Sequence, residues 1–156
     1  QKYVNLYAGV NSRLDELQAR ILSHKLEYLD EENVRRSRIA ETYLSNINND
    51  LIHLPSCDRP EEHVWHLFVV QSRFRAMLQS HLTDTGVQTL IHYPIPPHKQ
   101  KALIQYSGLA LPITERVHRE VLSLPMDPTM TDEEVEEVIE GCNSFKAGPE
   151  YETEMD

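Results

Sequence analysis

The first residues whose types suggest chemistry are Asn11, Ser12 and Arg13, which precede a long run of regularly spaced apolar residues. The start of a helix carries unpaired N–H groups and a partial positive charge. An asparagine amide and a guanidinium placed there would bind an anion such as a phosphate or a carboxylate. Capping of the helix by Asn11 or Ser12, with Arg13 in solvent, is the alternative, and the local sequence favours it because such caps are common.

The second candidate is the segment 92–98, His-Tyr-Pro-Ile-Pro-Pro-His, which follows an apolar run. Prolines restrict the backbone, so the imidazole of His92 and the phenol of Tyr93 could be kept in place at little entropic cost. Binding groups often lie in loops at the ends of strands. A surface turn with a half-buried Tyr93 explains the same residues equally well, and both interpretations stay open.

Four histidines, His63, His66, His92 and His98, lie in or beside two predicted strands and raise the question of a zinc site. His63 and His66 are three positions apart on a predicted strand, so their side chains should point to opposite faces. No third ligand follows at the spacing of a zinc finger, and we expect no metal. The motifs Ser-x-x-Lys and Gly-x-Ser-x-Gly and a Gly-rich phosphate loop are absent from the sequence, which therefore offers no candidate nucleophile.

Length and charge narrow the classes of function. The chain has 156 residues, enough for about one domain with a real core. Its formal net charge is −10, and no run of basic residues is present, so nucleic acid and anionic membranes are poor partners. Two scattered cysteines, Cys57 and Cys142, indicate a reducing compartment, and we expect a cytoplasmic protein. The first residues, Gln1 to Val10, contain no signal-peptide core and no initiator methionine, and we expect a fragment.

The elements that must position these residues begin with a long helix. Residues 12 to about 50 have the strongest helical periodicity, with apolar residues at three- and four-residue steps. We expect this helix to open at Asn11-Ser12, to bend near residues 28–33 and to end in the polar cluster 46–50.

The rest of the chain alternates between strands and helices. In chain order we expect a loop at 51–61, a strand at 63–70, a helix at 72–85 with Gly86 after it, a strand at 87–93, a helix from Pro112 supported by Val117, Val121 and Leu122, a short extended piece at 124–125, and a last helix opened by the capping box Thr131-x-x-Glu134.

This order predicts the α+β class, with a small sheet covered by helices. We divide the chain into a helical connecting segment at 1–50, a small α+β domain at 51–147 and an acidic, disordered tail at 148–156. The long helix has more apolar surface than the small sheet can cover. We therefore expect Leu14, Leu17 and Ile21 to be exposed within a single copy.

Several motifs resemble one family in order and in type. They are Gly9-Val10-Asn11-Ser12-Arg13-Leu14-Asp15-Glu16-Leu17-Gln18-Ala19, Lys25 to Asp30 with Arg35-Arg36, His63 to Phe68, Ile91 to His98, Glu115-Arg116, and Leu122 to Met126 with Thr131 to Glu134. Together they resemble the C-terminal half of the DegT/DnrJ/EryC1/StrS aminotransferases, over residues 3 to about 143. These are fold-type-I enzymes that use pyridoxal 5'-phosphate and act on nucleotide-linked keto-sugars.

The resemblance implies a role for each candidate residue. Asn11 would contact the cofactor phosphate across a homodimer interface, Arg13 would support the same region, and His92 and Tyr93 would line the sugar-nucleotide cleft. The family's Schiff-base lysine lies upstream of this region, and none of the five lysines here has its sequence context. The resemblance therefore implies no catalytic residue in this chain and no activity for the chain alone. Glutamate would be the usual amino donor, and the products would serve cell-surface polysaccharide, lipopolysaccharide or deoxyaminosugar biosynthesis.

Two alternatives remain beside the aminotransferase. In the dehydratase branch of the same family a histidine replaces the lysine and pyridoxamine phosphate drives deoxygenation. A non-catalytic scaffold, left by a decayed gene, is the other. The residue at the position of the missing lysine would distinguish the aminotransferase from the dehydratase. An intact upstream cofactor domain would exclude the scaffold.

Overall fold

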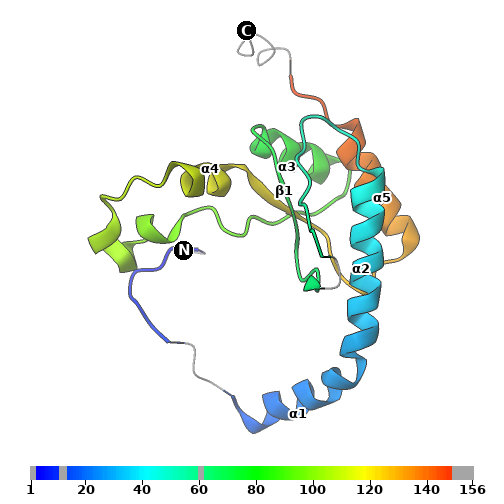
Figure 1. Cartoon of the computed structure of the whole chain (residues 1–156), viewed down its shortest axis with the longest axis horizontal. Coiled ribbons are helices and arrows are strands. Elements are labelled where there is room, and N and C mark those ends of the chain that lie inside the picture. The colour runs from blue at the N-terminus through cyan, green and yellow to red at the C-terminus, as the bar shows by residue number, and fades with distance from the viewer. Residues whose placement is uncertain (1–2, 11–13, 60–61, 149–156) are drawn as a thin grey trace.

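The computed structural model describes residues 3–10, 14–59 and 62–148 (Figure 1). Asn11 to Arg13 and the acidic stretch 149–156 lie outside the described residues. The elements in chain order are α1 (Glu16–Lys25), the 3₁₀ turn η1 (Leu26–Tyr28), α2 (Leu29–Asn46), β1 (Phe68–Gln71), α3 (Arg75–Asp84), the 3₁₀ turns η3 (Pro97–Lys99) and η4 (Lys101–Tyr106), α4 (Pro112–Glu120), β2 (Val121–Leu124) and α5 (Asp132–Ser144).

The fold is α+β, as the sequence predicts. Strands β1 and β2 pair in antiparallel fashion, with Phe68 opposite Leu124 at one end and Gln71 opposite Val121 at the other. Single bridges extend this ladder on both sides, since His53 pairs with Gln71 and Leu90 pairs with Ser123.

A single core joins the sheet to three helices. It forms between the second half of α2, the inner faces of α3 and α5, and both strands, and its fully buried large side chains include Ile39, Tyr43, Phe68, Val70, Leu78, Leu82 and Leu122. The predicted inward face of α5 is confirmed, because Val135, Val138, Ile139 and Cys142 are all buried. The Thr131–Glu134 capping box opens this helix as expected.

The N-terminal helical segment differs from the prediction at its start. α1 begins at Glu16 with Asp15 as its N-cap, so the expected opening at Asn11-Ser12 is wrong. The bend expected near residues 28–33 corresponds to the 3₁₀ turn η1, which lies slightly earlier, between α1 and α2. Figure 1 shows α1 directed away from the core. In a single copy Leu14, Leu17 and Ile21 are 69%, 74% and 53% exposed, which confirms the predicted uncovered face.

The first predicted strand, 63–70, begins five residues too early, since β1 starts at Phe68. Trp65 has a left-handed backbone with φ of 49°, and its N–H donates to Nδ1 of His63 at 2.9 Å. An N–H used in this way cannot join a ladder, so pairing starts only at Phe68.

The second predicted strand, 87–93, is reduced to the bridge at Leu90. The N–H of Val87 donates to the carbonyl of Leu82 at 2.7 Å, which closes the end of α3, and Gly86 before it has φ of 90°. The backbone at the start of this segment thus completes a helix end.

The boundary between α4 and the following strand also differs from the prediction. α4 begins at Pro112 as expected, but it ends at Glu120, and Val121 and Leu122 are the first residues of β2. Pairing with β1 buries both side chains, which their helical spacing alone did not reveal.

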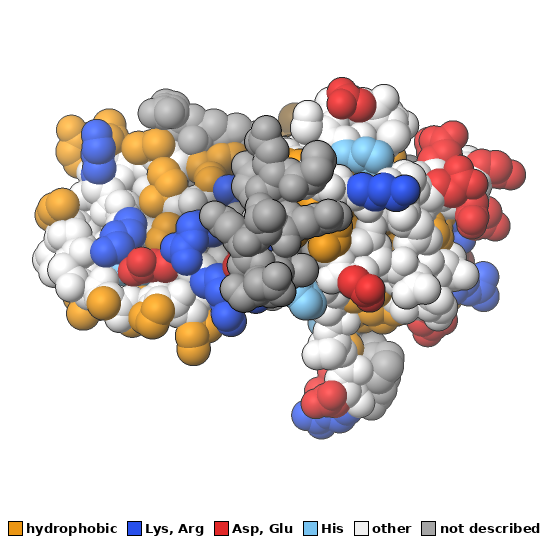
Figure 2. All heavy atoms as spheres, turned by 90° about the horizontal axis from the view of Figure 1, so that it is seen from above, with side chains coloured by type: hydrophobic (Ala, Val, Ile, Leu, Met, Phe, Trp, Pro, Cys, Tyr) orange, Lys and Arg blue, Asp and Glu red, His pale blue; other side chains and the backbone are white. Residues whose placement is uncertain are grey.

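Charge and hydropathy are unevenly distributed over the surface. Figure 2 shows acidic side chains at the end where α5 lies and hydrophobic side chains at the opposite end, where η4 and the start of α4 lie. Within the described part of the chain, no helix combines the length and the hydropathy needed to cross a bilayer.

Candidate functional site

Only part of the predicted site falls on described residues. Asn11 and Arg13 lie outside them, so the geometry of the proposed anion site is not on view. His92 and Tyr93 are described, and they are adjacent to each other at the point where the chain leaves the sheet after Leu90.

His92 is held through its ring. Nδ1 of the imidazole lies 2.9 Å from Oγ of Ser123, a buried residue of β2. Leu90, two residues earlier, forms both backbone hydrogen bonds with Ser123, N–H to carbonyl in each direction. The same residue of β2 therefore fixes the backbone before His92 and the imidazole of His92 itself.

Tyr93 is held through its backbone instead. Its carbonyl oxygen is hydrogen-bonded to Nδ1 of His118 on α4. A carbonyl can only accept, so His118 carries a proton on Nδ1. The phenol ring is 54% exposed and meets the rings of Tyr3 and His92 edge-on, with centroids 5.6 Å and 5.5 Å away. A ring that is about half exposed suits a structural residue of the turn as well as a ligand-binding group, so both interpretations of Tyr93 stay open.

The turn that follows is attached to α4 by a hydrogen bond between side chains. His98 is buried, and its Nε2 lies 3.0 Å from Oε1 of Glu115. The N–H of Leu111 and the ammonium of Lys99 also approach this carboxylate, at 3.3 Å and 3.8 Å. The hydrogen bond from His98, followed by that from Leu111, holds the pKa of Glu115 below its ordinary value.

A buried glutamine brings the N-terminal segment to the same place. The side chain of Gln100 donates to the carbonyl of Tyr3 at 3.1 Å and accepts from the N–H of Asn5 at 3.0 Å. Ala102 donates in turn to the carbonyl of Asn5 at 2.9 Å. Residues 3–5 therefore lie along residues 100–102, near the start of η4 (Figure 1). The ring of Tyr3 contacts that of Tyr93.

The sequence alone did not identify four residues of this site: Ser123, His118, Gln100 and Tyr3. Ser123 is 31 residues from its partner, His118 is 25 and Gln100 is 97 from Tyr3. No local spacing connects such pairs. The only signal present was that Ser123 is a polar residue within the apolar run 121–124.

His63 and His66 lie outside β1, so the expected placement of their side chains on opposite faces of one strand is wrong. His63 packs against Trp65 with ring centroids 4.0 Å apart and an angle of 36° between the rings, and it accepts the N–H of Trp65. Over residues 3–10, 14–59 and 62–148, no three His, Cys, Asp or Glu side chains are grouped so that they could bind a metal ion.

The described lysines do not suit covalent attachment of an aldehyde cofactor. Lys99 donates to the carbonyls of Ser107 and Leu109, at 2.9 Å and 3.2 Å, and lies near Glu115, so its amine is already engaged. Lys25, Lys101 and Lys146 are exposed on the surface. A reactive lysine needs a neutral amine in a desolvated or electropositive site.

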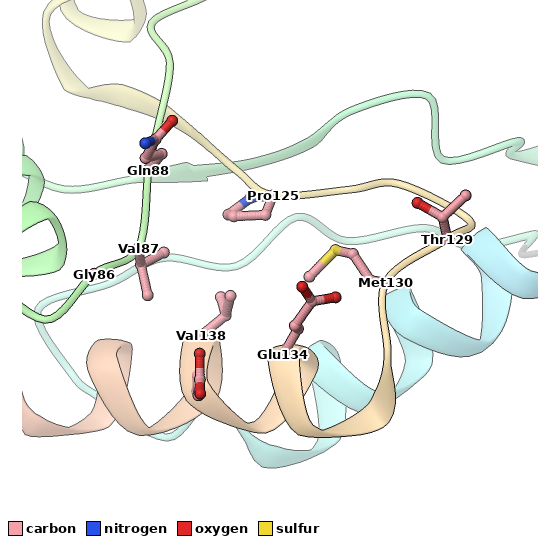
Figure 3. A pocket seen from close by; sticks show the side chains of 9 residues that line it. Gly86, Val87, Gln88, Pro125, Thr129, Met130, Glu134 and Val138 are labelled. Carbon is pink, nitrogen blue, oxygen red and sulfur yellow. The ribbon is translucent and has the colours of Figure 1, made fainter.

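A separate cavity of about 370 Å³ lies between residues 86–88, the loop after β2 and α5 (Figure 3). None of its lining residues belongs to the turn at 92–98. Of its two carboxylates, Glu134 and Glu137, the first already accepts the N–H of Thr131 at 2.9 Å as part of the capping box. This cavity is distinct from the candidate site.

Solved structures share this fold. A structure of DesV from S. venezuelae matches with a TM-score of 0.78 and 41% identity, covering 92% of this chain and 39% of DesV. A structure of NtdA from Bacillus subtilis with bound cofactor PMP matches with a TM-score of 0.74 and 40% identity, covering 86% and 33% of the two chains.

Curated relatives agree with the structural matches. The dTDP-3-amino-3,6-dideoxy-alpha-D-galactopyranose transaminase of Aneurinibacillus thermoaerophilus is 55% identical over 93% of this chain and 40% of its own length. The erythromycin biosynthesis sensory transduction protein EryC1 of Saccharopolyspora erythraea is 44% identical over 95% and 40%. This chain thus spans about two-fifths of the length of these relatives.

The family model of the DegT/DnrJ/EryC1/StrS aminotransferases matches residues 1–143, which is most of the chain. That match agrees with the order of motifs in the sequence and with the fold of the solved relatives. The chain belongs to the DegT/DnrJ/EryC1/StrS aminotransferase family.

Proposed function

We propose that this chain is the C-terminal portion of a pyridoxal-phosphate-dependent aminotransferase that transfers an amino group, with glutamate as donor, to a nucleotide-linked keto-sugar. The observation that carries the proposal is the 55% identity to a dTDP-aminosugar transaminase over nearly the whole chain. At that level of identity we assign a dTDP-linked 3-keto-hexose as the substrate class. The product would enter cell-surface polysaccharide or deoxyaminosugar biosynthesis.

In this proposal His92 and Tyr93 bind the nucleotide sugar. Both side chains are presented at the start of a proline-restricted turn, and each is held by an atom other than the one it would offer to a ligand. Nε2 of His92 and the phenol of Tyr93 can hydrogen-bond to phosphate or sugar oxygens. The fixed backbone means that little conformational entropy is lost when the ligand binds.

The cofactor would be held largely by residues beyond those described. When bound, it acts as the electron sink for amino transfer, and the protein positions and polarises it. We propose that Asn11 and Arg13 contact its phosphate across the interface of a homodimer. The amide and the guanidinium are suited to an oxyanion.

The dehydratase alternative is less well supported. The relatives compared above include a protein named as a transaminase, and none of them is named as a dehydratase. The chain carries no feature that separates the two reactions, because the deciding lysine or histidine belongs to the region upstream of the Asn-Ser-Arg motif.

The test is to express the complete reading frame and incubate the enzyme with glutamate and a dTDP-linked 3-keto-6-deoxyhexose. We expect equimolar 2-oxoglutarate and dTDP-linked 3-aminosugar, detected by mass spectrometry. A deoxygenated sugar without incorporated nitrogen would identify a dehydratase. The absence of any turnover across dTDP- and UDP-linked keto-sugars would contradict both enzymes.

A further inference from the structure

The turn at 92–98 is supported by one continuous segment, α4 together with β2. Glu115 contacts His98, His118 contacts the carbonyl of Tyr93, and Ser123 contacts the ring of His92. Glu115 and His118 are three residues apart, which places them on one face of α4. The order of the three supporting residues along this segment is the reverse of the order of their partners along the turn.

The segment is itself fixed to the rest of the molecule. Two hydrogen bonds tie the end of α4 to residues at and before the start of α3. The guanidinium of Arg75 donates to the carbonyl of His118 at 2.8 Å, and the N–H of Ser72 donates to the carbonyl of Glu120 at 3.0 Å. β2 pairs with β1 along its whole length. The position of the segment formed by α4 and β2 is therefore set by the core and not by the turn.

Ser123 has the most restricted surroundings of the three supporting residues. It is buried, both of its backbone groups bond to Leu90, and its hydroxyl lies 2.9 Å from Nδ1 of His92. A buried hydroxyl proton requires an acceptor. Among the described residues, Nδ1 of His92 is the acceptor within reach. We therefore infer that the hydroxyl donates to Nδ1, and a ring nitrogen that accepts carries no proton, which leaves the N–H of His92 on Nε2.

We propose that Ser123 is a positioning residue that fixes both the orientation and the tautomer of His92, so that Nε2–H is directed to an oxygen of the bound nucleotide sugar. No hydrogen bond from Nε2 to another described residue is present, so this donor is left to the ligand. The inference rests on the proposed function, in which His92 is a ligand-binding residue. Ser123 itself does not touch the ligand.

The first measurement needs no mutation of Ser123. Long-range ¹H–¹⁵N correlation spectra of the full-length enzyme, labelled with ¹⁵N-histidine, report the tautomer of His92, with its signals assigned by their loss in His92→Ala. We expect the neutral form with the proton on Nε2 in the wild type. A neutral His92 with its proton on Nδ1 would overturn the proposal.

The second measurement is a double-mutant cycle on ligand affinity. dTDP-glucose is the probe, and its dissociation constant is measured by titration calorimetry for the wild type, Ser123→Ala, His92→Ala and the double variant. Loss of one hydrogen bond to a neutral group predicts that Ser123→Ala weakens binding about 3- to 10-fold. In the His92→Ala background the same change should have less than about a twofold effect, because nothing remains to be positioned. Ser123→Thr keeps the hydroxyl and should bind within about twofold of the wild type.

The outcomes separate the two proposals. If His92→Ala leaves binding unchanged, His92 is not a ligand residue and that part of the proposed function fails. If His92→Ala weakens binding but Ser123→Ala does not, or if Ser123→Ala is equally harmful with and without His92, the positioning role fails alone. If Ser123→Ala does not fold, Ser123→Thr and the wild-type tautomer still decide the question.

Discussion

His92 and Tyr93 are adjacent in sequence, yet the structure holds them in different ways. The imidazole of His92 is bound at Nδ1, whereas Tyr93 is bound at its carbonyl and its phenol remains exposed. A substitution at Tyr93 can therefore remove the ligand-binding group without removing the contact that shapes the turn.

Replacement of Tyr93 by Phe removes the phenol hydroxyl and keeps the ring against Tyr3. We expect an unchanged melting temperature, since changes at exposed positions away from special features alter stability by less than about 0.5 kcal/mol. Affinity for dTDP-glucose should fall about 3- to 10-fold. Tyr106→Phe is the matched control, because Tyr106 is similarly exposed on η4 and lies outside the turn. Equal effects of the two variants on affinity would remove Tyr93 from the proposed site.

Asn11→Ala tests the proposed contact with the cofactor phosphate in the full-length enzyme. A hydrogen bond to a charged group is worth about 1.5–3 kcal/mol, so the dissociation constant of pyridoxal phosphate should rise about 10- to 100-fold. Capping of α1 is the function of Asp15, which makes Asp15→Ala the control. That variant should lose about 1 kcal/mol of stability with little change in cofactor affinity. A stability loss in Asn11→Ala with normal cofactor binding would contradict the assignment.

At the scale of the elements, α4 is attached to the turn by polar contacts. None of its residues is fully buried, and four hydrogen bonds place it, to His98, to the carbonyl of Tyr93, from Arg75 and from Ser72. Its attachment should therefore respond to pH more than the packing of α3 or α5 does.

The Glu115–His98 contact predicts a pH-dependent stability. The pKa of Glu115 is lowered in the folded state, chiefly by the His98 hydrogen bond, so its carboxylate stabilises the fold above the unfolded pKa, near 4.5, and this contribution is lost as pH falls through the folded pKa. We expect the wild type to melt higher than Glu115→Gln at pH 6–7, and the difference to shrink as pH falls below about 4.5. Melting curves across this range test it. A difference that stays constant with pH would show that the charge is not involved.

The contact between α3 and α5 depends on a glycine. A Cβ built on Gly141 would lie 3.0 Å from Cδ2 of Leu82 and 3.3 Å from Oγ1 of Thr85. Gly141→Val should therefore lower the free energy of unfolding by about 1–3 kcal/mol, although valine is the better helix former. Chemical denaturation measures it, and Glu140→Ala, at an exposed neighbouring position, should be close to neutral. A stabilised Gly141→Val protein would mean that the two helices can separate at little cost.

At the scale of the whole molecule, the chain has an uncovered apolar face. Leu14, Leu17 and Ile21 are more than half exposed, and Figure 1 shows α1 away from the core. The chain spans about two-fifths of its relatives, and α1 follows directly on the Asn11–Arg13 motif that we assign to the cofactor phosphate. We therefore expect this face to be covered in the full-length enzyme.

Leu17→Ser in the full-length enzyme tests the coverage of this face. A large apolar side chain that is buried contributes about 1.5–3 kcal/mol, so the variant should unfold at clearly lower denaturant concentration. Arg20→Ala, a change at an exposed polar position on the same helix, is the control and should be close to neutral. Unchanged stability of Leu17→Ser would show that α1 remains exposed in the complete protein.

The sequence by itself determined the features that depend on neighbouring residues. The apolar spacing and the Thr131–Glu134 capping box located α5, Pro112 located the start of α4, and the family motifs located the turn at 92–98. These signals suffice because helix ends and proline turns are fixed by interactions over three or four residues.

Only the tertiary structure decided the extent of the strands and the partners of the site residues. β1 starts late because His63 takes the N–H of Trp65, and Val121 and Leu122 form a strand because β1 lies beside them. Ser123 and Gln100 became part of the site through contacts that span 31 to 97 residues. Such contacts form only when packing brings distant segments together, and one sequence carries no periodicity that encodes them.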